Sequence, residues 1–247
     1  VVARLARETE LDVDVIQFGD MSKITGDARA ALDGCRAVNI QPLSYQSSLI
    51  SSADVVVDAL FGTGLDRELD SDCQSLIEDI NELSSAVLSL DIPSGLHADT
   101  GKAMTLAIKA DATLTFIAMK QGLLTAQGPS YCGEIIFSTL DVPNDIYELV
   151  TAAAQRIDLN VLRSFLPARD RITHKGQCGH VLVIGGDYGY AGAVRMAGEA
   201  AMRVGAGLVT VGTRREHALN IPLVRPELMA AALDKANDLN RLLEKAS

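Results

Sequence analysis

One pattern occurs twice in this sequence and constrains the fold more than any other feature: an apolar run, a turn rich in glycine, and the start of a helix. It occurs first as VVVDALFGTGLDREL at residues 55–69 and again as GHVLVIGGDYGYAGA at residues 179–193. An apolar strand that leads through glycines into a helix is the usual opening of a nucleotide-binding α/β unit. The sequence therefore predicts two such units in one chain.

Strands and helices are expected to alternate, which implies a mainly parallel sheet with helices on both faces. Helices are expected at residues 1–7, 26–34, 69–83 and 191–204, with a short helical connection at 145–164. Strands are expected at residues 13–18, 37–40, 55–60, 87–91, 110–117, 134–139, 180–184 and 207–212. Because the character of the sequence changes near residues 150–165, we expect two domains, at residues 1–150 and 151–247.

Two segments give more detailed expectations about packing. The run Val55–Leu60 is almost continuously apolar, as is typical of a strand covered on both faces. The helix at 191–204 carries a face of small residues that should lie close to a sheet, namely Ala193, Ala197, Ala200 and Ala201. Its opposite face carries charges at i, i+4 spacing that should pair in solvent, namely Arg195, Glu199 and Arg203. The second domain is short for an open α/β fold, so we expect its strands to leave apolar surface partly uncovered.

Charge and cysteine content narrow the classes of function. With 22 Lys and Arg against 32 Asp and Glu, the formal net charge is −10, which argues against nucleic acid or an anionic membrane as a partner. No run approaches the ~20 apolar residues of a membrane span. Four scattered cysteines without metal-like spacing predict free thiols in a reducing cytoplasm. The oligomeric state stays open, a homo-oligomer included.

Two acidic residues, Asp58 and Asp91, fall at the ends of expected strands, where ligands bind in open α/β sheets. Asp58 is followed closely by Phe-Gly-Thr-Gly and Asp91 directly by Ile-Pro-Ser-Gly. Two carboxylates on neighbouring strand ends can bind a cation, orient a sugar hydroxyl or move a proton. Either one alone is better explained as a cap of the turn beside it. The two together, with glycines in both turns, favour a functional site.

Other residues near the turns carry weaker signals. Gly62 and Gly64 lack the third glycine of the dinucleotide fingerprint. His97 lies in a loop, where a lone histidine is more often solvated than catalytic. His174 and Lys175 fit a phosphate contact and a solvated loop equally well. The stretch GGDYGYAGA surrounds a helix start, which offers free N–H groups, but no GK[ST] follows, so it is not a P-loop.

Four motifs, in this order, make the sequence similar to a known family. They are DALFGTGLDREL, LDIPSGLHADTG, KQGLLTAQGPSYCG and HKGQCGHVLVIGGDYGYAGAVRMAGEAAMRVGAGLVTV. Over essentially its whole length the chain resembles the bifunctional NAD(P)H-hydrate repair enzymes. The resemblance implies a three-layer, Rossmann-like NAD(P)H-hydrate epimerase domain at residues 1–150. The start of a ribokinase-like α/β domain, the ADP-dependent NAD(P)H-hydrate dehydratase, is then expected at residues 151–247.

The resemblance also implies the chemistry, an isomerase and a lyase that act on one damaged cofactor. Hydrated NADH or NADPH carries a hydroxyl at C6 of the nicotinamide ring, in an R or an S form. The epimerase of the family interconverts the two forms and uses a potassium ion. The dehydratase uses ADP, with Mg²⁺, to remove water from the S form.

The family's site residues are carried over only onto matching positions. Asp58 and Ser94 match potassium-site positions of the epimerase. Asp91 matches a substrate-contacting position and is our choice for the catalytic group, which would handle a proton during reversible opening at C6. Ala193 matches a substrate-contacting helix start in the second domain. The substrate loop of the epimerase matches Gly62, Thr63, Gly64, Leu65, Asp66, Arg67 and Glu68.

Some motifs of the family have no counterpart in the sequence. An NNGGDG-type loop would precede Val1, and an NPH-type loop and a GxGD anion hole would follow Ser247. We therefore expect a fragment that lacks both ends of the parent protein and is impaired in both activities. Two other interpretations remain. One is an unrelated nucleotide-dependent transferase or oxidoreductase, with one sheet that continues across residue 150. The other is a non-enzymatic binding module that uses the epimerase fold.

Overall fold

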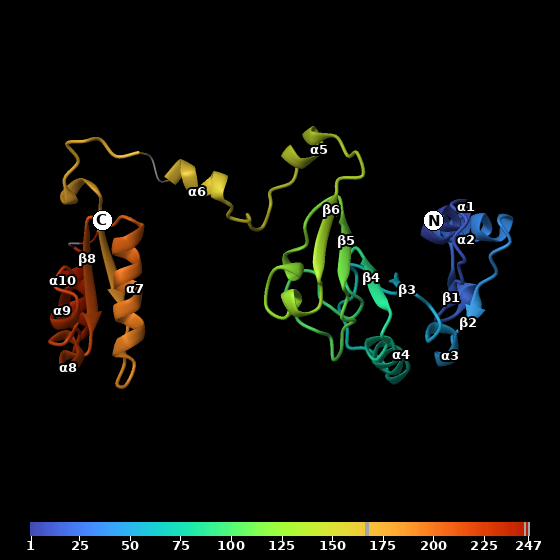
Figure 1. Cartoon of the computed structure of the whole chain (residues 1–247), viewed down its shortest axis with the longest axis horizontal. Helices are drawn as coiled ribbons and strands as arrows, with labels where there is room; N and C mark the ends of the chain where they lie inside the picture. Colours follow the sequence, from blue (N-terminus) through green and yellow to red (C-terminus); the bar gives the residue numbers. More distant parts are fainter. Residues whose placement is uncertain (166–167, 245, 247) are drawn as a thin grey trace. The chain divides into compact units, whose positions relative to one another are not determined.

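A computed structural model of the chain describes residues 1–165, 168–244 and 246. The chain divides into two compact units, Val1–Gln155 and Arg156–Ser247 (Figure 1). The described strands of the two units belong to separate sheets. The interpretation that required one sheet across residue 150 is therefore wrong.

The first unit contains two parallel sheets, one with the order β1-β2 and one with the order β3-β4-β5-β6. Its strands are β1 (Ile16–Gln17), β2 (Leu43–Ser44), β3 (Val55–Asp58), β4 (Ala86–Leu90), β5 (Ala112–Phe116) and β6 (Glu134–Ser138). Its α-helices are α1 (Val2–Glu8), α2 (Gly26–Ala37), α3 (Ser47–Ile50), α4 (Ser71–Asn81) and α5 (Asn144–Glu148). Short 3-10 helices lie at Met21–Lys23, Gln121–Leu123 and Gly128–Ser130. Parallel sheets with interleaved helices confirm the predicted α/β class.

The strand expected at residues 37–40 is wrong. Helix α2 continues to Ala37, because Leu32 and Cys35 bury one of its faces. The chain then turns through Asn39, which has a φ of 62°, and the Ile40 N–H closes the turn on the carbonyl of Cys35 at 3.0 Å. The strand follows only at β2.

The sheet β3–β6 is packed on one face by α4. Val56 and Val87, which are opposite each other in the register, belong to the same apolar core as Leu76 and Ile77 of that helix. On the other face of β3, Val55 is 55% exposed. The expectation that this strand is covered on both faces is wrong, because α4 covers only the face that carries Val56.

The second unit is a parallel sheet of order β7-β8-β9 with α7 against it. Its strands are β7 (His180–Ile184), β8 (Leu208–Thr213) and β9 (Met229–Ala232). Its helices are α6 (Leu159–Phe165), α7 (Ala191–Val204), α8 (Arg215–Ala218), α9 (Ile221–Val224), α10 (Ala236–Leu243) and a 3-10 turn at Lys175–Gln177. The elements from α8 onward were not predicted. The helical connection expected at 145–164 is two helices, α5 and α6, with residues 149–158 between them.

The predicted alanine face of α7 is only partly right: Ala201 packs against the core, but Ala193, Ala197 and Ala200 are exposed. Val194 and Gly198 are buried instead. A Cβ on Gly198 would lie 3.0 Å from Val211 Cγ2, so this glycine sets the close approach of helix and strand. The charged face is as predicted, with Glu199 paired to Arg195 at 3.4 Å and to Arg203 at 4.0 Å.

The expected uncovered surface of the second unit occurs in only one of the two strands. In β7, Val181 and Ile184 are 38% and 53% exposed. Strand β8 is almost wholly buried, because it lies between its two neighbours in the sheet. None of the described helices in either unit is long and apolar enough to cross a membrane.

Candidate functional site

The two acidic residues singled out in the sequence lie at one edge of the sheet β3–β6. Asp58 is the last residue of β3 and is opposite Ser89 of β4. Asp91 directly follows the last residue of β4. The two strands are parallel neighbours, so their carboxyl ends meet at the same edge. The predicted placement of the two carboxylates is confirmed.

Asp58 is a buried carboxylate, with 2% of the residue exposed. Its Oδ2 accepts hydrogen bonds from Ser89 Oγ at 2.7 Å and from the Ser94 N–H at 2.8 Å. Its Oδ1 accepts from Ser94 Oγ at 2.6 Å and from the Leu60 N–H at 3.3 Å. All of these donors are neutral, and no described side chain forms an ion pair with Asp58. The partners of this carboxylate are therefore hydroxyl and backbone N–H groups.

Ser94 ties the turn after β3 to the turn after β4. Besides its contact with Asp58, its hydroxyl accepts a hydrogen bond from the Phe61 N–H at 2.9 Å. The next residue, Gly95, has a φ of 95°, and a Cβ there would collide with the carbonyl oxygen of Leu106. The turn Ile-Pro-Ser-Gly thus needs its glycine for both conformation and space.

Asp91 has a φ of 71°, a left-handed conformation that Asp adopts more readily than most residues. Its N–H donates to the Leu114 carbonyl at 2.7 Å, which anchors the backbone to β5. Its carboxylate is held on one side only: Oδ1 forms an ion pair with Lys120 Nζ and accepts a weaker bond from the Phe116 N–H at 3.4 Å. The other oxygen, Oδ2, lies 3.9 Å from the position of a Cβ on Gly62. Asp91 therefore turns one oxygen toward the glycine loop.

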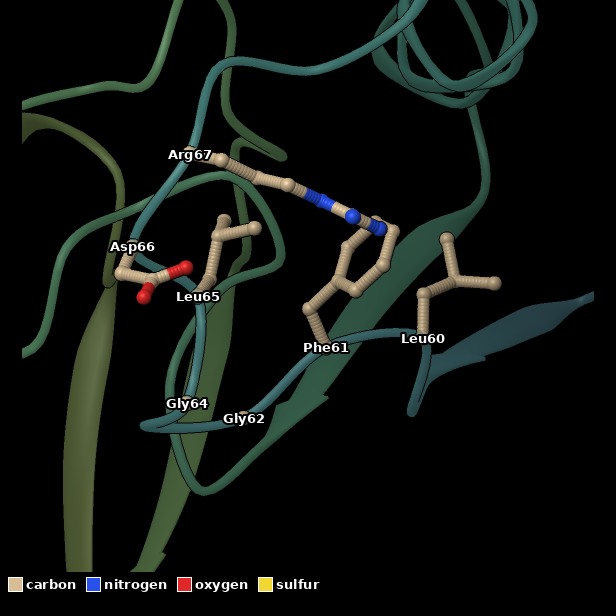
Figure 2. Close-up of a pocket in the computed structure, with 7 residues that line it drawn as sticks. All are labelled: Leu60, Phe61, Gly62, Gly64, Leu65, Asp66 and Arg67. Atoms are coloured by element: carbon tan, nitrogen blue, oxygen red, sulfur yellow. The ribbon is translucent and has the colours of Figure 1, made fainter.

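Five residues of the glycine loop (residues 62–68), together with Leu60 and Phe61, line a pocket of about 390 Å³ (Figure 2). Figure 2 shows the Arg67 side chain extending across the loop toward Phe61. The predicted loop residues differ in their surroundings. Leu65 is buried in the core beside α4, so it anchors the loop. The remaining six are exposed, and of these Thr63 and Glu68 do not line the pocket.

The other predicted residues have contacts of their own. His97 Nδ1 accepts from the backbone N–H groups of Asp99 and Thr100 at 3.2 and 3.3 Å, so the ring caps its own turn. His174 and Lys175 lie at a 3-10 turn of the second unit.

Ala193 is exposed in the first turn of α7, next to the second glycine turn. In that turn the Gly186 carbonyl accepts from Thr213 Oγ1 at 3.0 Å. The hydrogen bond from Arg214 to Asp187, at 2.8 Å, holds the pKa of that carboxyl below its usual value. The turn is thus braced by side chains from the end of β8 and the residue after it.

Sequence reasoning missed two residues of the first site. Ser89 was not predicted as a site residue. The alternation of side chains along β4 places it on the same face as Val87, and the register between β3 and β4 places it beside Asp58. Lys120 lies in a quoted motif, four residues after the end of β5, but its partner Asp91 is 29 residues away in sequence. The sequence signal that could have identified Lys120 is a basic residue that follows closely after β5, the strand next to β4 in the sheet.

Comparisons with known proteins concern the family and the fold of the chain. Residues 1–122 match the family model described as YjeF-related protein N-terminus, and residues 181–247 match the model described as NAD(P)H-hydrate dehydratase. The crystal structure of yeast ynu0, YNL200c, superposes with a TM-score of 0.51 at 14% identity, covering 64% of this chain and 68% of that one. At that identity the likeness concerns the fold alone.

Two curated relatives cover nearly the whole chain. The bifunctional NAD(P)H-hydrate repair enzyme Nnr of Coxiella burnetii is 45% identical over 247 residues, which is 100% of this chain and 51% of that protein. The protein of the same name from Escherichia coli is 38% identical over 94% of this chain and 45% of its own length. The chain thus spans about half the length of the curated relatives it matches. The two family models and these relatives together show that the chain belongs to the family of bifunctional NAD(P)H-hydrate repair enzymes.

Proposed function

We propose that the protein repairs hydrated NADH and NADPH. Residues 1–150 form the epimerase domain, which interconverts the R and S forms. Residues 151–247 belong to the dehydratase domain, which removes water from the S form with ADP as co-substrate. The observation that carries the proposal is the meeting of Asp58, Asp91 and the loop 62–68 at one sheet edge.

Asp91 is the proposed catalytic group. Its Oδ2 is directed toward the loop that would hold substrate. In the proposed step, this oxygen accepts the proton of the C6 hydroxyl while the C6–N1 bond of the ring breaks, and N1 takes up a proton. Closure of the open chain on the opposite face, with the protons returned, gives the other epimer. A positioned carboxylate is suited to this exchange because it alternates between base and acid.

The loop supplies binding rather than chemistry. Gly62 and Gly64 present backbone without side chains, which leaves room for a ligand next to the pocket of about 390 Å³. Thr63, Asp66, Arg67 and Glu68 add exposed polar groups, and Leu65 fixes the loop to the core. Arg67 offers a planar cation suited to phosphate groups of the cofactor.

A potassium ion fits the residues around Asp58. Asp58 is buried, and its carboxylate, the Ser94 hydroxyl and nearby carbonyl oxygens are the kinds of ligand that a hard cation prefers. When bound, the ion would contact this carboxylate and hold the two turns together. Asp58 and Ser94 are the residues that would contact it.

In the second unit, the proposed dehydratase role concerns the binding of an anionic ligand. Its glycine turn and the exposed first turn of α7, with Ala193, present free N–H groups that suit an anionic ligand. The described residues include no group of three or more His, Cys, Asp or Glu side chains placed so that they could hold a metal ion. Mg²⁺ would therefore be held largely through the phosphates of ADP, as is common for this ion.

The cysteines bear on the cellular compartment of the protein. All four cysteines are free, and burial raises the pKa of Cys73 and Cys132 to about 11, so these thiols are poorly reactive. Free thiols support a reducing, cytoplasmic location.

The test is to supply the purified R form of hydrated NADH and follow conversion to the S form by chromatography. Conversion that depends on potassium, and that falls when potassium is replaced by a bulky organic cation, would support the epimerase and its ion. Addition of ADP should restore reduced-nicotinamide absorbance if the dehydratase is also complete. Absence of conversion in the unmodified natural protein would refute the epimerase assignment. Equal conversion with the organic cation would refute the potassium site.

A further inference from the structure

We propose that Lys120 is a positioning residue for Asp91: it holds Oδ1 so that Oδ2 faces the substrate loop. This inference rests on the proposed epimerase function. It assigns a role to a residue that neither the strand-end pattern nor the loop motif identified.

The ion pair differs from the others in the described part of the chain. Lys120 is 14% exposed and Asp91 is 27% exposed in their side chains, whereas every other described ion pair has at least one partner more than one third exposed. Exposed pairs contribute little to stability, and partly buried pairs carry a desolvation cost. Stability alone therefore does not account for this pair, which lies beside the glycine loop.

Lys120 is itself fixed at a second point. Its Nζ donates to the Phe116 carbonyl at 2.8 Å as well as to Asp91 Oδ1. Phe116 is the last residue of β5, and its N–H is the other donor to Oδ1. The ammonium group is therefore anchored to the end of β5, and the carboxylate is aligned with the same strand end.

The geometry leaves a single oxygen of Asp91 for substrate. With Oδ1 occupied by a charge-assisted bond, rotation of the carboxylate is restricted. Oδ2 then lies beside Gly62, where the loop has no side chain to block it. Removing Lys120 would release the carboxylate to rotate, and misplacement of a catalytic group by about 1 Å can cost roughly a hundredfold in rate.

The experiment compares Lys120→Met, Lys120→Arg, Asp91→Asn and the double variant in the natural protein, with hydrated NADH as substrate. Lys109→Met is the matched control, because Lys109 is exposed and contacts Asn81 only through its backbone N–H. Lys120→Met should lower kcat about tenfold to a hundredfold with little change in KM. Lys120→Arg should restore most of kcat because it keeps the charge.

The double variant tests whether Lys120 acts through Asp91. If it does, Asp91→Asn and the double variant should have the same kcat, because the group being positioned is already lost. Multiplied losses in the double variant would overturn the positioning role. So would a kcat of Lys120→Met equal to that of Lys109→Met, or a loss that Lys120→Arg does not relieve.

The outcomes separate this inference from the proposed function. If the unmodified protein fails to interconvert the epimers, both fall. If it interconverts them, and Asp91→Asn is slow while Lys120→Met is not, only the role of Lys120 falls. A crystal structure of Lys120→Met gives a readout independent of rate. The carboxylate of Asp91 should turn from its position beside Gly62, and an unchanged position would overturn the inference.

Discussion

At the scale of single residues, Asp91 is the proposed catalytic group. Asp91→Asn should slow epimerisation by roughly a hundredfold or more, since the amide cannot accept and return a proton. The fold should be retained, because Asn also tolerates the φ of 71° found at this position. The measurement is the rate of R to S conversion beside a thermal unfolding curve. Asp99→Asn, an exposed change in a neighbouring loop, is the control, and a rate of Asp91→Asn equal to that control would reduce Asp91 to a turn cap.

Tyr45 allows a prediction about pH. Burial and its hydrogen bond to Asp79 raise the pKa of Tyr45 to about 12 in the folded protein, above the ordinary value of 10.0. A raised pKa means that the stabilisation is complete below pH 10 and is lost as the pH rises from 10 to 12. Buried thiols contribute a loss in the same direction, so the comparison is with Tyr45→Phe. The free energy of unfolding of the natural protein should fall more steeply over this window than that of the variant, and parallel curves would contradict the raised pKa.

The placement of Asp58 and Asp91 could be predicted because parallel strands bring their carboxyl ends to one edge. Lys120 could not be assigned in the same way, since its role depends on how the chain turns after β5. The sequence also did not predict that His97 caps its own turn, where Nδ1 accepts hydrogen bonds from two backbone N–H groups.

At the scale of elements, the turn after β4 is the most sensitive to substitution. Gly95→Ala should destabilise the first unit by about 3 kcal/mol or more, because alanine there is strained at a φ of 95° and its Cβ meets the Leu106 carbonyl. Gly64→Ala is the control, since a Cβ on Gly64 meets no atom within 4 Å. Urea unfolding curves of both variants give the comparison. If the two midpoints shift equally, the turn does not need its glycine.

Hydrophobic pattern predicted most elements but not which face of each would be covered. In α7 the alanines suggested a small-residue face, yet the sheet takes up Val194 and Gly198, because the position of β8 decides the rotation of the helix. In β3 a continuous apolar run suggested burial on both sides, although α4 covers only the face that carries Val56. Such errors arise because the hydrophobic pattern indicates which residues can be buried but does not indicate which helix or strand packs against them.

At the scale of the whole molecule, the two units should separate on limited proteolysis. Residues 149–158 connect α5 to α6 without regular structure, and Leu149 and Val150 are 80% and 71% exposed. A protease that prefers apolar residues should cut here first and yield two fragments, identified by mass. Leu149→Glu with Val150→Glu should slow this cut without altering later ones. A first cut within β3–β6 would mean that the first unit opens more readily than the connection.

The order of the strands has a consequence for synthesis on the ribosome. In each described sheet every strand pairs with the strand that precedes it in sequence: β1 with β2, then β3 to β6 in turn, then β7 to β9. No strand has to insert between two that are already paired. Each new strand can pair with the open edge of the sheet once the connection that precedes it has been synthesised. The only loop that must close at each step is the connection between the new strand and the strand before it. The sheets can therefore assemble in the direction of translation, and the site around Asp91 is complete once β5 and Lys120 have emerged.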